Sequence, residues 1–299
     1  MILVTGATGQ LGNAAIQSLL TKGVPGNGIT ALVRDENKAV HLKDKGVQIK
    51  AGNYNDYNSL KDALQGVDKL LLVSSNEITA DILEQHKNVI NAAKENGVNH
   101  IVYTSMDLKD FKTTVIPYVT QVHKDTADYL KETGIDYTIL DNTLYADSIE
   151  KYIGETFLDH GIFFPAADGK LRWAPRVEMG EAAAVVLTTP GHQNKTYTIA
   201  GNTAYSFEDI ADLLSSILGK KIAYLKPDVD TYIEGLVKGG IPEQVASFLG
   251  GFGTAIGNGE FDTNRSDLER LLGRKPMELK EFLKIKYSNI IPQKSDALS

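Results

Sequence analysis

Apolar and polar positions alternate in two patterns along the first half of the chain. Short runs such as 2–4 and 69–73 are apolar throughout, which is typical of strands covered on both faces. Between these runs, apolar residues recur every three or four positions, which predicts amphipathic helices. The pattern predicts strands at 2–4, 29–33, 47–51, 69–73, 100–104 and 136–140, with helices near 11–20, 37–45, 60–64, 81–96 and 119–133. Because strands and helices alternate, we expect right-handed crossovers and an α/β fold with a Rossmann-like, doubly wound parallel sheet.

The pattern becomes irregular after about residue 145. We therefore predict a Rossmann domain over 1–145 and a smaller, mostly helical lid domain over 146–290, with one strand near 196–200 returning to the sheet. Within the lid, helices are expected at 207–218, 229–238, 242–249 and 279–285. Glycines between 250 and 259 suggest a mobile loop, either a substrate gate or an ordinary connection. Residues 291–299 are polar and predict a disordered tail.

Three glycines, Gly6, Gly9 and Gly12, lie between the first strand and the first helix. Such glycines permit a tight turn, let a pyrophosphate approach the backbone and let the helix pack closely on the strand. The free N–H groups of the helix N-terminus then face the phosphates. The spacing is GxxGxxG rather than GxGxxG, and a plain structural turn is the alternative. The position of the motif favours dinucleotide binding, so we expect the domain over 1–145 to bind NAD(P) and the lid over 146–290 to bind the substrate.

Arg34 follows the second strand, about twenty residues after the glycines. Sites that prefer NAD usually carry an acid at this place, which accepts hydrogen bonds from the adenosine ribose, whereas an arginine suits a 2′-phosphate. Lys38 could assist, and Asp35 could cap the following helix. The sequence therefore favours NADP (NADPH) over NAD, with a solvated strand-end charge as the alternative for Arg34.

Composition limits the other possibilities. The chain has 299 residues, a net charge of −7 and no cysteine. Disulfides, thiol catalysis and cysteine-bound metal are thereby excluded, and its six histidines show no ligand spacing, so no metal site is expected. The acidic balance argues against a nucleic-acid partner, and no apolar run is long enough to cross a membrane. We expect a cytoplasmic protein, and both a monomer and a homodimer fit the sequence.

Seven segments can be compared with known families: TGATGQLG at 5–12, LVR at 32–34, ALQGVDKLLLVS at 63–74, NVINAA at 88–93, GV at 97–98, YTS at 103–105 and GHQNKTY at 191–197. Together they resemble the NmrA-like family of atypical short-chain dehydrogenases/reductases. The resemblance covers almost the whole chain and implies a reductase that acts on a quinone or a similar electron-poor, conjugated acceptor. The cofactor contacts that it implies are at Gly6, Thr8, Gly9, Gln10, Leu11, Gly12, Arg34, Asn53, Ser74, Ser75, Thr104, Ser105 and Met106.

Two positions depart from the family. Asn53 stands where relatives often have an acid near the adenine, and Asp141 stands where close relatives have an arginine. The loss of a positive charge before Asn142 could change the polarity of the substrate side.

The common short-chain dehydrogenases use a tyrosine acid with a lysine four residues later. The tyrosines around the expected fifth and sixth strands lack such a lysine, because Tyr118 is followed at that distance by Val122 and Tyr103 by Asp107. Reduction of a quinone needs less from the protein, since hydride can pass directly once the two rings are held in line and a donor stabilises the developing oxyanion. The absence of the pair argues against a sugar-nucleotide epimerase. It is compatible with an NADP-sensing regulatory protein that turns nothing over.

Four residues are candidates for the acceptor side: His123, Asn142, Tyr145 and Met106. His123 could donate a proton or stabilise an oxyanion, although a histidine near a helix end is more often structural. Tyr145 could stack on a quinone or pack between domains. Asn142 could bind cofactor or substrate, or turn the chain, and Met106 could line the cofactor face or fill space.

Overall fold

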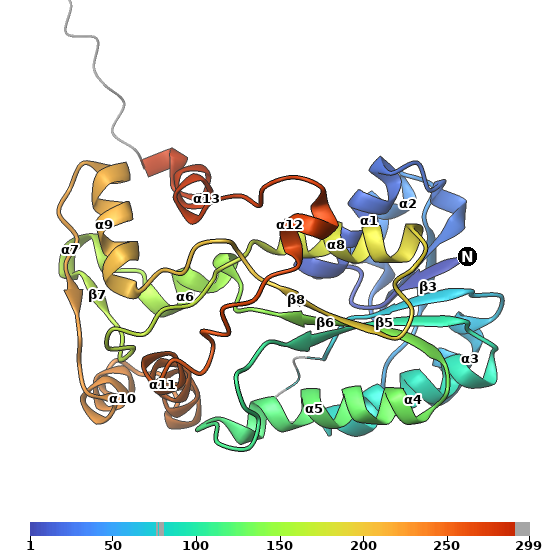
Figure 1. Cartoon of the computed structure of the whole chain (residues 1–299), viewed down its shortest axis with the longest axis horizontal. Coiled ribbons are helices and arrows are strands. Elements are labelled where there is room, and N and C mark those ends of the chain that lie inside the picture. Colours follow the sequence, from blue (N-terminus) through green and yellow to red (C-terminus); the bar gives the residue numbers. More distant parts are fainter. Residues whose placement is uncertain (76, 78–80, 291–299) are drawn as a thin grey trace, which may run out of the picture.

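A seven-stranded parallel sheet forms the centre of the computed structural model, which describes residues 1–75, 77 and 81–290 (Figure 1). The strand order is β3-β2-β1-β4-β5-β6-β8, and every pairing is parallel. The order reverses between β1 and β4, so the doubly wound fold predicted from the sequence is confirmed. The strands are β1 (Ile2–Val4), β2 (Ile29–Val33), β3 (Gln48–Ala51), β4 (Lys69–Leu72), β5 (His100–Met106), β6 (Asp136–Asn142) and β8 (Lys195–Ile199).

Helices cover both faces of the sheet. One face carries α1 (Gln10–Thr21), α2 (Val40–Lys43), α8 (Arg176–Thr188) and α12 (Leu268–Leu272), and the other carries α3 (Tyr57–Leu64), α4 (Ile82–Glu95) and α5 (Pro117–Glu132) (Figure 1). Successive residues of a strand enter opposite layers. On β5, Val102 joins the apolar core beneath α1 and α8, while Tyr103 joins the core beneath α3, α4 and α5.

Apart from the apolar layers on the two faces of the sheet, which we count together as its first core, a second core lies beside the carboxyl ends of the strands. Aromatic side chains dominate it, with Phe164 and Phe207 rings 4.7 Å apart and Trp173 only 3 % exposed. The elements around it are α6 (Ile149–Ile153), α7 (Phe157–His160), β7 (Ile162–Phe163), α9 (Phe207–Leu218), β9 (Tyr224–Leu225), α10 (Val229–Lys238), α11 (Glu243–Gly257) and α13 (Leu279–Lys286).

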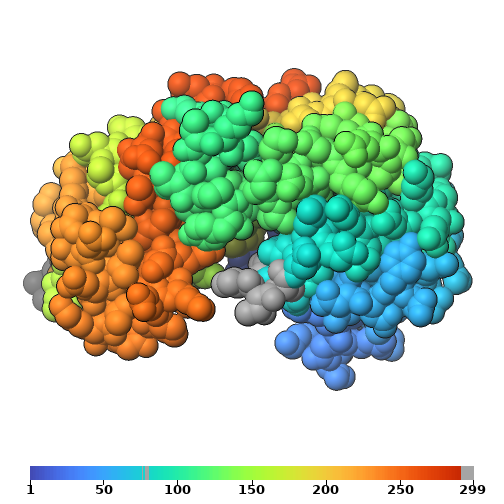
Figure 2. Space-filling view, turned by 90° about the horizontal axis from the view of Figure 1, so that it is seen from below, coloured from blue at the N-terminus to red at the C-terminus, as the bar shows by residue number. Residues whose placement is uncertain are grey.

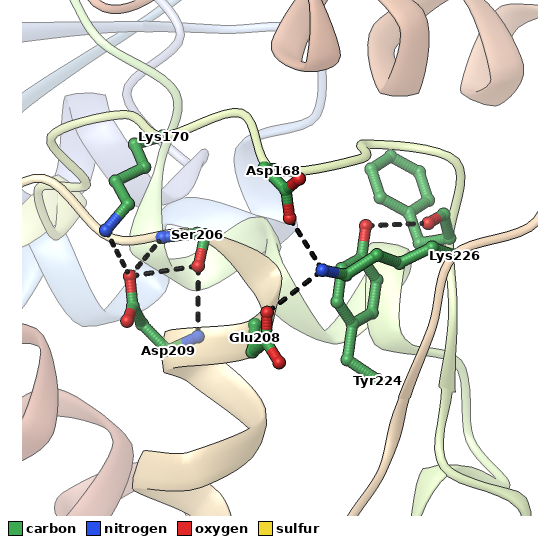
Figure 3. A network of polar contacts seen from close by, with 8 residues as sticks. Asp168, Lys170, Ser206, Glu208, Asp209, Tyr224 and Lys226 are labelled. Carbon is green, nitrogen blue, oxygen red and sulfur yellow. Dashed lines mark hydrogen bonds and ion pairs between the residues drawn. The ribbon is translucent and has the colours of Figure 1, made fainter.

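A polar network fixes the start of α9 (Figure 3). The Ser206 hydroxyl accepts from the Asp209 amide at 3.1 Å, and the Asp209 carboxylate accepts from the Ser206 amide at 2.9 Å, which completes a capping box. Lys170 pairs with the same carboxylate at 3.2 Å. Beside this cap, Lys226 pairs with Asp168 at 2.6 Å and with Glu208 at 2.9 Å, so the loop before the lid helices is tied to α9.

Two expectations from the sequence are corrected. The glycines at 250–257 lie inside α11, not in a mobile loop, because they serve close packing: a Cβ on Gly253 would lie 2.6 Å from the Pro165 ring, and one on Gly250 would lie 3.1 Å from Ile233. The helix expected at 37–45 is a 3₁₀ turn followed by the four residues of α2.

The predicted division at residue 145 stays a prediction, although three elements that follow it, α8, β8 and α12, pack with the sheet rather than with the second core. The tail predicted at 291–299 lies outside the described residues. Among the helices of the described part, none is long and apolar enough to cross a membrane.

Candidate active site

The turn between β1 and α1 forms an open N-terminus. Gly6 has a φ of 57°, which a glycine adopts without strain, and a Cβ on Gly12 would lie 2.3 Å from the Gly6 carbonyl oxygen. Gly9 is the N-cap and has no side chain to cap the helix. Within the described part of the chain, the amides of Gln10, Leu11 and Gly12 therefore have no acceptor. Such free amides suit a phosphate.

Thr8 and Gln10 are exposed beside this turn, whereas the Leu11 side chain is buried in the core. A contact from Leu11 to a cofactor would therefore come from its backbone. The side chain of Gln10 accepts a hydrogen bond at 2.6 Å from Arg176, at the start of α8. Arg176 also donates to the Ser148 hydroxyl at 3.1 Å and lies 4.1 Å above the Tyr145 ring. Arg176 thus connects the glycine turn with Tyr145, a role that sequence reasoning missed.

Arg34 lies at the end of β2, where the sequence predicted it, and two thirds of its side chain is exposed. Its guanidinium forms an ion pair with Glu77. The other carboxylate oxygen of Glu77 accepts from Gln85 at 2.9 Å. An anion already faces the arginine in this structure, and no motif in the sequence pointed to Glu77.

Asn53 shapes the turn before α3. Its side-chain oxygen accepts from the Asn55 amide at 3.0 Å, and its own amide donates to Ser59 at 3.1 Å. The side chain is therefore used within the turn, and its contact with the adenine stays a prediction.

Ser74 and Ser75 follow β4 and are tied to neighbouring elements. The Ser74 amide donates to the Thr104 hydroxyl of β5 at 3.0 Å, and the Ser75 amide donates to His86 of α4 at 2.9 Å. Ser105 and Met106 complete β5, and Met106 packs against the second core. The expected residues after β4 and β5 therefore meet at one edge of the sheet, as the carboxyl ends of parallel strands must.

Asn142, the last residue of β6, has an unusual environment. It is 3 % exposed, and neither its amide nitrogen nor its side-chain oxygen has a hydrogen-bond partner in the described structure. Buried polar atoms without partners are rare and costly. Tyr145 lies close by, and burial raises the pKa of its phenol, with the charge of Arg176 acting in the opposite direction. A buried amide with two open positions suits a bound polar ligand.

His123, in the first half of α5, is half-buried and lies next to Tyr103, whose hydroxyl is 3.1 Å from its Nδ1 atom. Burial lowers the pKa of His123 to about 4. The ring is therefore neutral near pH 7. It can donate a hydrogen bond through its one N–H group, but it lacks the second ring proton that an imidazolium could transfer.

Asp141 lies on the opposite face of β6 from Asn142 and is largely buried. Burial raises the pKa of its carboxyl to about 6, and the nearby Asp107 adds to the rise. Asp107 is itself held by Thr263 and lies 3.5 Å from Arg265. Asp141, one of the two departures from the family noted in the sequence, is thus a side chain of raised pKa at the C-terminal end of β6.

Figure 2 shows a hollow between α10 and α11 on one side and the α4 and α5 region on the other. The glycine turn and the ends of β4, β5 and β6 lie at the same edge of the sheet, because all the strands are parallel. Among the described residues no group of three or more histidine, aspartate or glutamate side chains could hold a metal ion.

Comparison with known proteins identifies the family. The model of the NmrA-like family matches residues 1–290. The chain belongs to the NmrA-like family. Quinone oxidoreductase 2 of Escherichia coli is 37% identical to this NmrA-like protein over 284 residues, which are 94% of this chain and 96% of that one.

Solved structures agree. Triphenylmethane reductase of Citrobacter sp., complexed with NADP(H), has a TM-score of 0.87 and 36% identity, and the match covers 95% of this NmrA-like chain and 99% of that chain. The NADPH-dependent quinone oxidoreductase QOR2 of Escherichia coli, complexed with NADPH, has a TM-score of 0.87 and 34% identity over 96% of this chain and all (100%) of that one. The family and fold expected from the motifs are therefore confirmed, while the individual roles of the site residues stay predictions.

Proposed function

We propose that this chain is an NADPH-dependent oxidoreductase that reduces a quinone or a similar electron-poor, conjugated acceptor. The observation that carries the proposal is the open N-terminus of α1, where three amides beside Gly6 and Gly9 have no acceptor among the described residues. The likeness to quinone oxidoreductase 2 and to triphenylmethane reductase, both structures solved with NADP(H) or NADPH, supports the cofactor and the kind of acceptor.

The residues present fit such a cofactor. The amides of Gln10, Leu11 and Gly12 would bind its pyrophosphate. Arg34 would bind the 2′-phosphate after exchanging its Glu77 partner for the ligand. The partnerless amide of Asn142 would hydrogen bond a polar group at the other end of the site. When bound, the nicotinamide supplies a hydride.

On the acceptor side, the protein has three tasks: to position the acceptor, to exclude water and to stabilise negative charge. Tyr145 offers an aromatic face backed by Arg176 at 4.1 Å. Asn142 and the neutral ring of His123 can donate hydrogen bonds to an oxygen that becomes negative. Because His123 is neutral at pH 7, the proton that completes the reduction would come from water rather than from an imidazolium.

Oxidation of NADPH, followed by absorbance against benzoquinones and naphthoquinones with NADH in parallel, tests the proposal. We expect turnover with NADPH well above turnover with NADH. Binding of NADPH, seen as enhanced nicotinamide fluorescence, without oxidation by any acceptor would contradict the reductase and favour an NADP-sensing regulatory protein. Retention of tightly bound NAD through purification would instead favour an epimerase. A cytoplasmic location stays a prediction.

A further inference from the structure

Two histidines that lie on different helices pack against buried polar groups. His86 on α4 is fully buried, and His123 on α5 is half-buried. Tyr103 of β5 lies between them, with ring centroids 5.5 Å from His86 and 6.3 Å from His123. These polar side chains lie between the sheet and helices α4 and α5, and they take no part in the glycine turn or in the ion pairs of the site.

The direction of the hydrogen bonds begins at the backbone. The Ser75 amide can only donate, and it lies 2.9 Å from His86 Nε2, so this nitrogen must accept. Burial lowers the pKa of His86 to about 3, so the ring is neutral and its proton lies on Nδ1. That proton is donated to the Thr126 hydroxyl at 2.9 Å.

A separate hydrogen bond orients His123. Within the described structure the Tyr103 hydroxyl has one hydrogen-bond partner, His123 Nδ1, and the Tyr103 side chain is fully buried. A buried hydroxyl proton without an acceptor would be costly. Burial raises the pKa of Tyr103 well above its usual range, and Asp141, Tyr145 and Tyr54 add to this rise, so the phenol stays protonated. Its proton then goes to His123 Nδ1, at 3.1 Å.

We infer that two sets of buried hydrogen bonds, Ser75–His86–Thr126 and Tyr103–His123, fix the two histidines as opposite neutral tautomers, with the proton of His123 on Nε2. No described residue bonds this nitrogen. His123 is thereby a fixed hydrogen-bond donor, and Tyr103 is its positioning residue. In the reductase, which rests on the proposed function, this donor would stabilise the oxyanion of the acceptor.

The tautomers can be measured on the full-length protein without cofactor. Long-range ¹H–¹⁵N spectra of protein labelled at histidine distinguish a protonated ring nitrogen from an unprotonated one. We expect opposite tautomers at neutral pH: Nδ1 protonated in His86 and Nε2 protonated in His123. His86→Gln and His123→Gln assign the signals. The same tautomer in both rings, or a positively charged His123, would overturn the inference, and the wild-type spectrum alone decides this.

Variants test the connection. In Tyr103→Phe, we expect the two His123 nitrogens to move toward intermediate shifts while the His86 signals stay in place. Thr126→Val should move the His86 signals, because that ring loses its acceptor. Tyr129→Phe is the matched control, since Tyr129 lies on α5 with Thr126 and His123 and its hydroxyl donates to Asn91 at 2.7 Å. An unchanged His123 spectrum in Tyr103→Phe would contradict the inference that the Tyr103 hydroxyl fixes the His123 tautomer.

Kinetics separate the inference from the proposed function. If the reductase is confirmed, Tyr103→Phe should lower kcat with a quinone by roughly tenfold, less than the about 10²–10³ loss that follows removal of an oxyanion donor. KM for NADPH should stay the same, because Tyr103 is not among the expected cofactor contacts and its hydroxyl bonds His123. The expected tautomers in a protein that reduces no acceptor would refute the proposed function and leave the inference standing.

Discussion

At the scale of single residues, the conflict at Arg34 is the most consequential feature. The guanidinium that suits a 2′-phosphate is paired with Glu77, so a cofactor must displace a carboxylate to reach it. Both partners are substantially exposed, and exposed ion pairs are worth little, up to about 1 kcal/mol. The pair is therefore weak enough to be exchanged for a doubly charged phosphate.

Replacing Arg34 by serine should weaken NADPH binding by roughly tenfold to a hundredfold, because hydrogen bonds to charged groups contribute about 1.5–3 kcal/mol. Binding of NADH should barely change. Titration of nicotinamide fluorescence measures both. Lys43→Ser, which removes an exposed cation from α2, is the control and should leave both affinities unchanged. Equal losses for the two cofactors would show that Arg34 does not bind the 2′-phosphate.

Replacing Glu77 by glutamine should have the opposite effect. The competing charge disappears while the side chain can still bond Gln85, so NADPH should bind up to about fivefold more tightly at low salt. The gain should shrink as salt is added, because exposed charges are screened. Weaker NADPH binding in Glu77→Gln, measured in the same titration, would mean that the carboxylate itself contributes to the cofactor site.

At the scale of elements, the caps and close contacts of helices decide where the lid lies. Helix α9 starts at the capping box of Ser206 and Asp209 and carries Phe207 into the second core. Because the cap fixes the first turn, it also fixes the aromatic cluster around Phe207. Helix α8 is placed by a close contact instead. A Cβ on Gly180 would lie 2.6 Å from Ala14 of α1, so the glycine lets the two helices pack closely.

Ser206→Ala should lower the free energy of unfolding by about 1 kcal/mol, the usual cost of a lost N-cap. Urea unfolding followed by circular dichroism measures this change. Ser216→Ala, on the exposed side of the same helix, is the matched control and should be neutral or slightly stabilising, because alanine favours the helix interior. Equal effects of the two changes would show that the cap contributes nothing beyond helix propensity.

At the scale of the whole molecule, the sheet with the apolar layers on its two faces lies beside the second core (Figure 1). The cores also hold histidines that lose their charge on folding. Burial lowers the pKa of His86 to about 3 and that of His100 to about 4, from an ordinary value of 6.5. Below pH 6.5 the unfolded chain binds these protons and the folded one does not, so stability falls as the pH falls toward 4.

His100 isolates this effect, because it lies at the start of β5, away from the candidate site, and bonds Thr138 at 2.8 Å. Asp141 acts in the opposite sense, since its raised pKa lets the folded state hold a proton below about pH 6. The comparison is therefore between wild type and His100→Gln. Between pH 6 and pH 5, the free energy of unfolding should fall less steeply with pH in the variant than in the wild type. The difference between the two slopes should be about 1.4 kcal/mol per pH unit. Parallel curves from urea unfolding would contradict a buried neutral His100.

The sequence by itself determined the elements of the sheet and the turn that opens the site. Periodicity is a local property, so the strands at 2–4 and 29–33 and the helix α10 appear within a residue of their predicted bounds. The glycine motif is equally local, because Gly6, Gly9 and Gly12 shape a turn with their own backbone. Helix α8 escaped detection, since it is buried on most sides and shows no apolar stripe.

Only the tertiary structure decided which side chains meet. Gln10 and Arg176 are 166 positions apart and bond because α8 packs on α1. The pairing of Arg34 with Glu77 and the hydrogen bonds of His86 with Ser75 and of His123 with Tyr103 likewise join residues from different elements. Sequence spacing specifies the direction of a side chain within one element, whereas contacts between elements depend on how their faces pack, which no local pattern encodes.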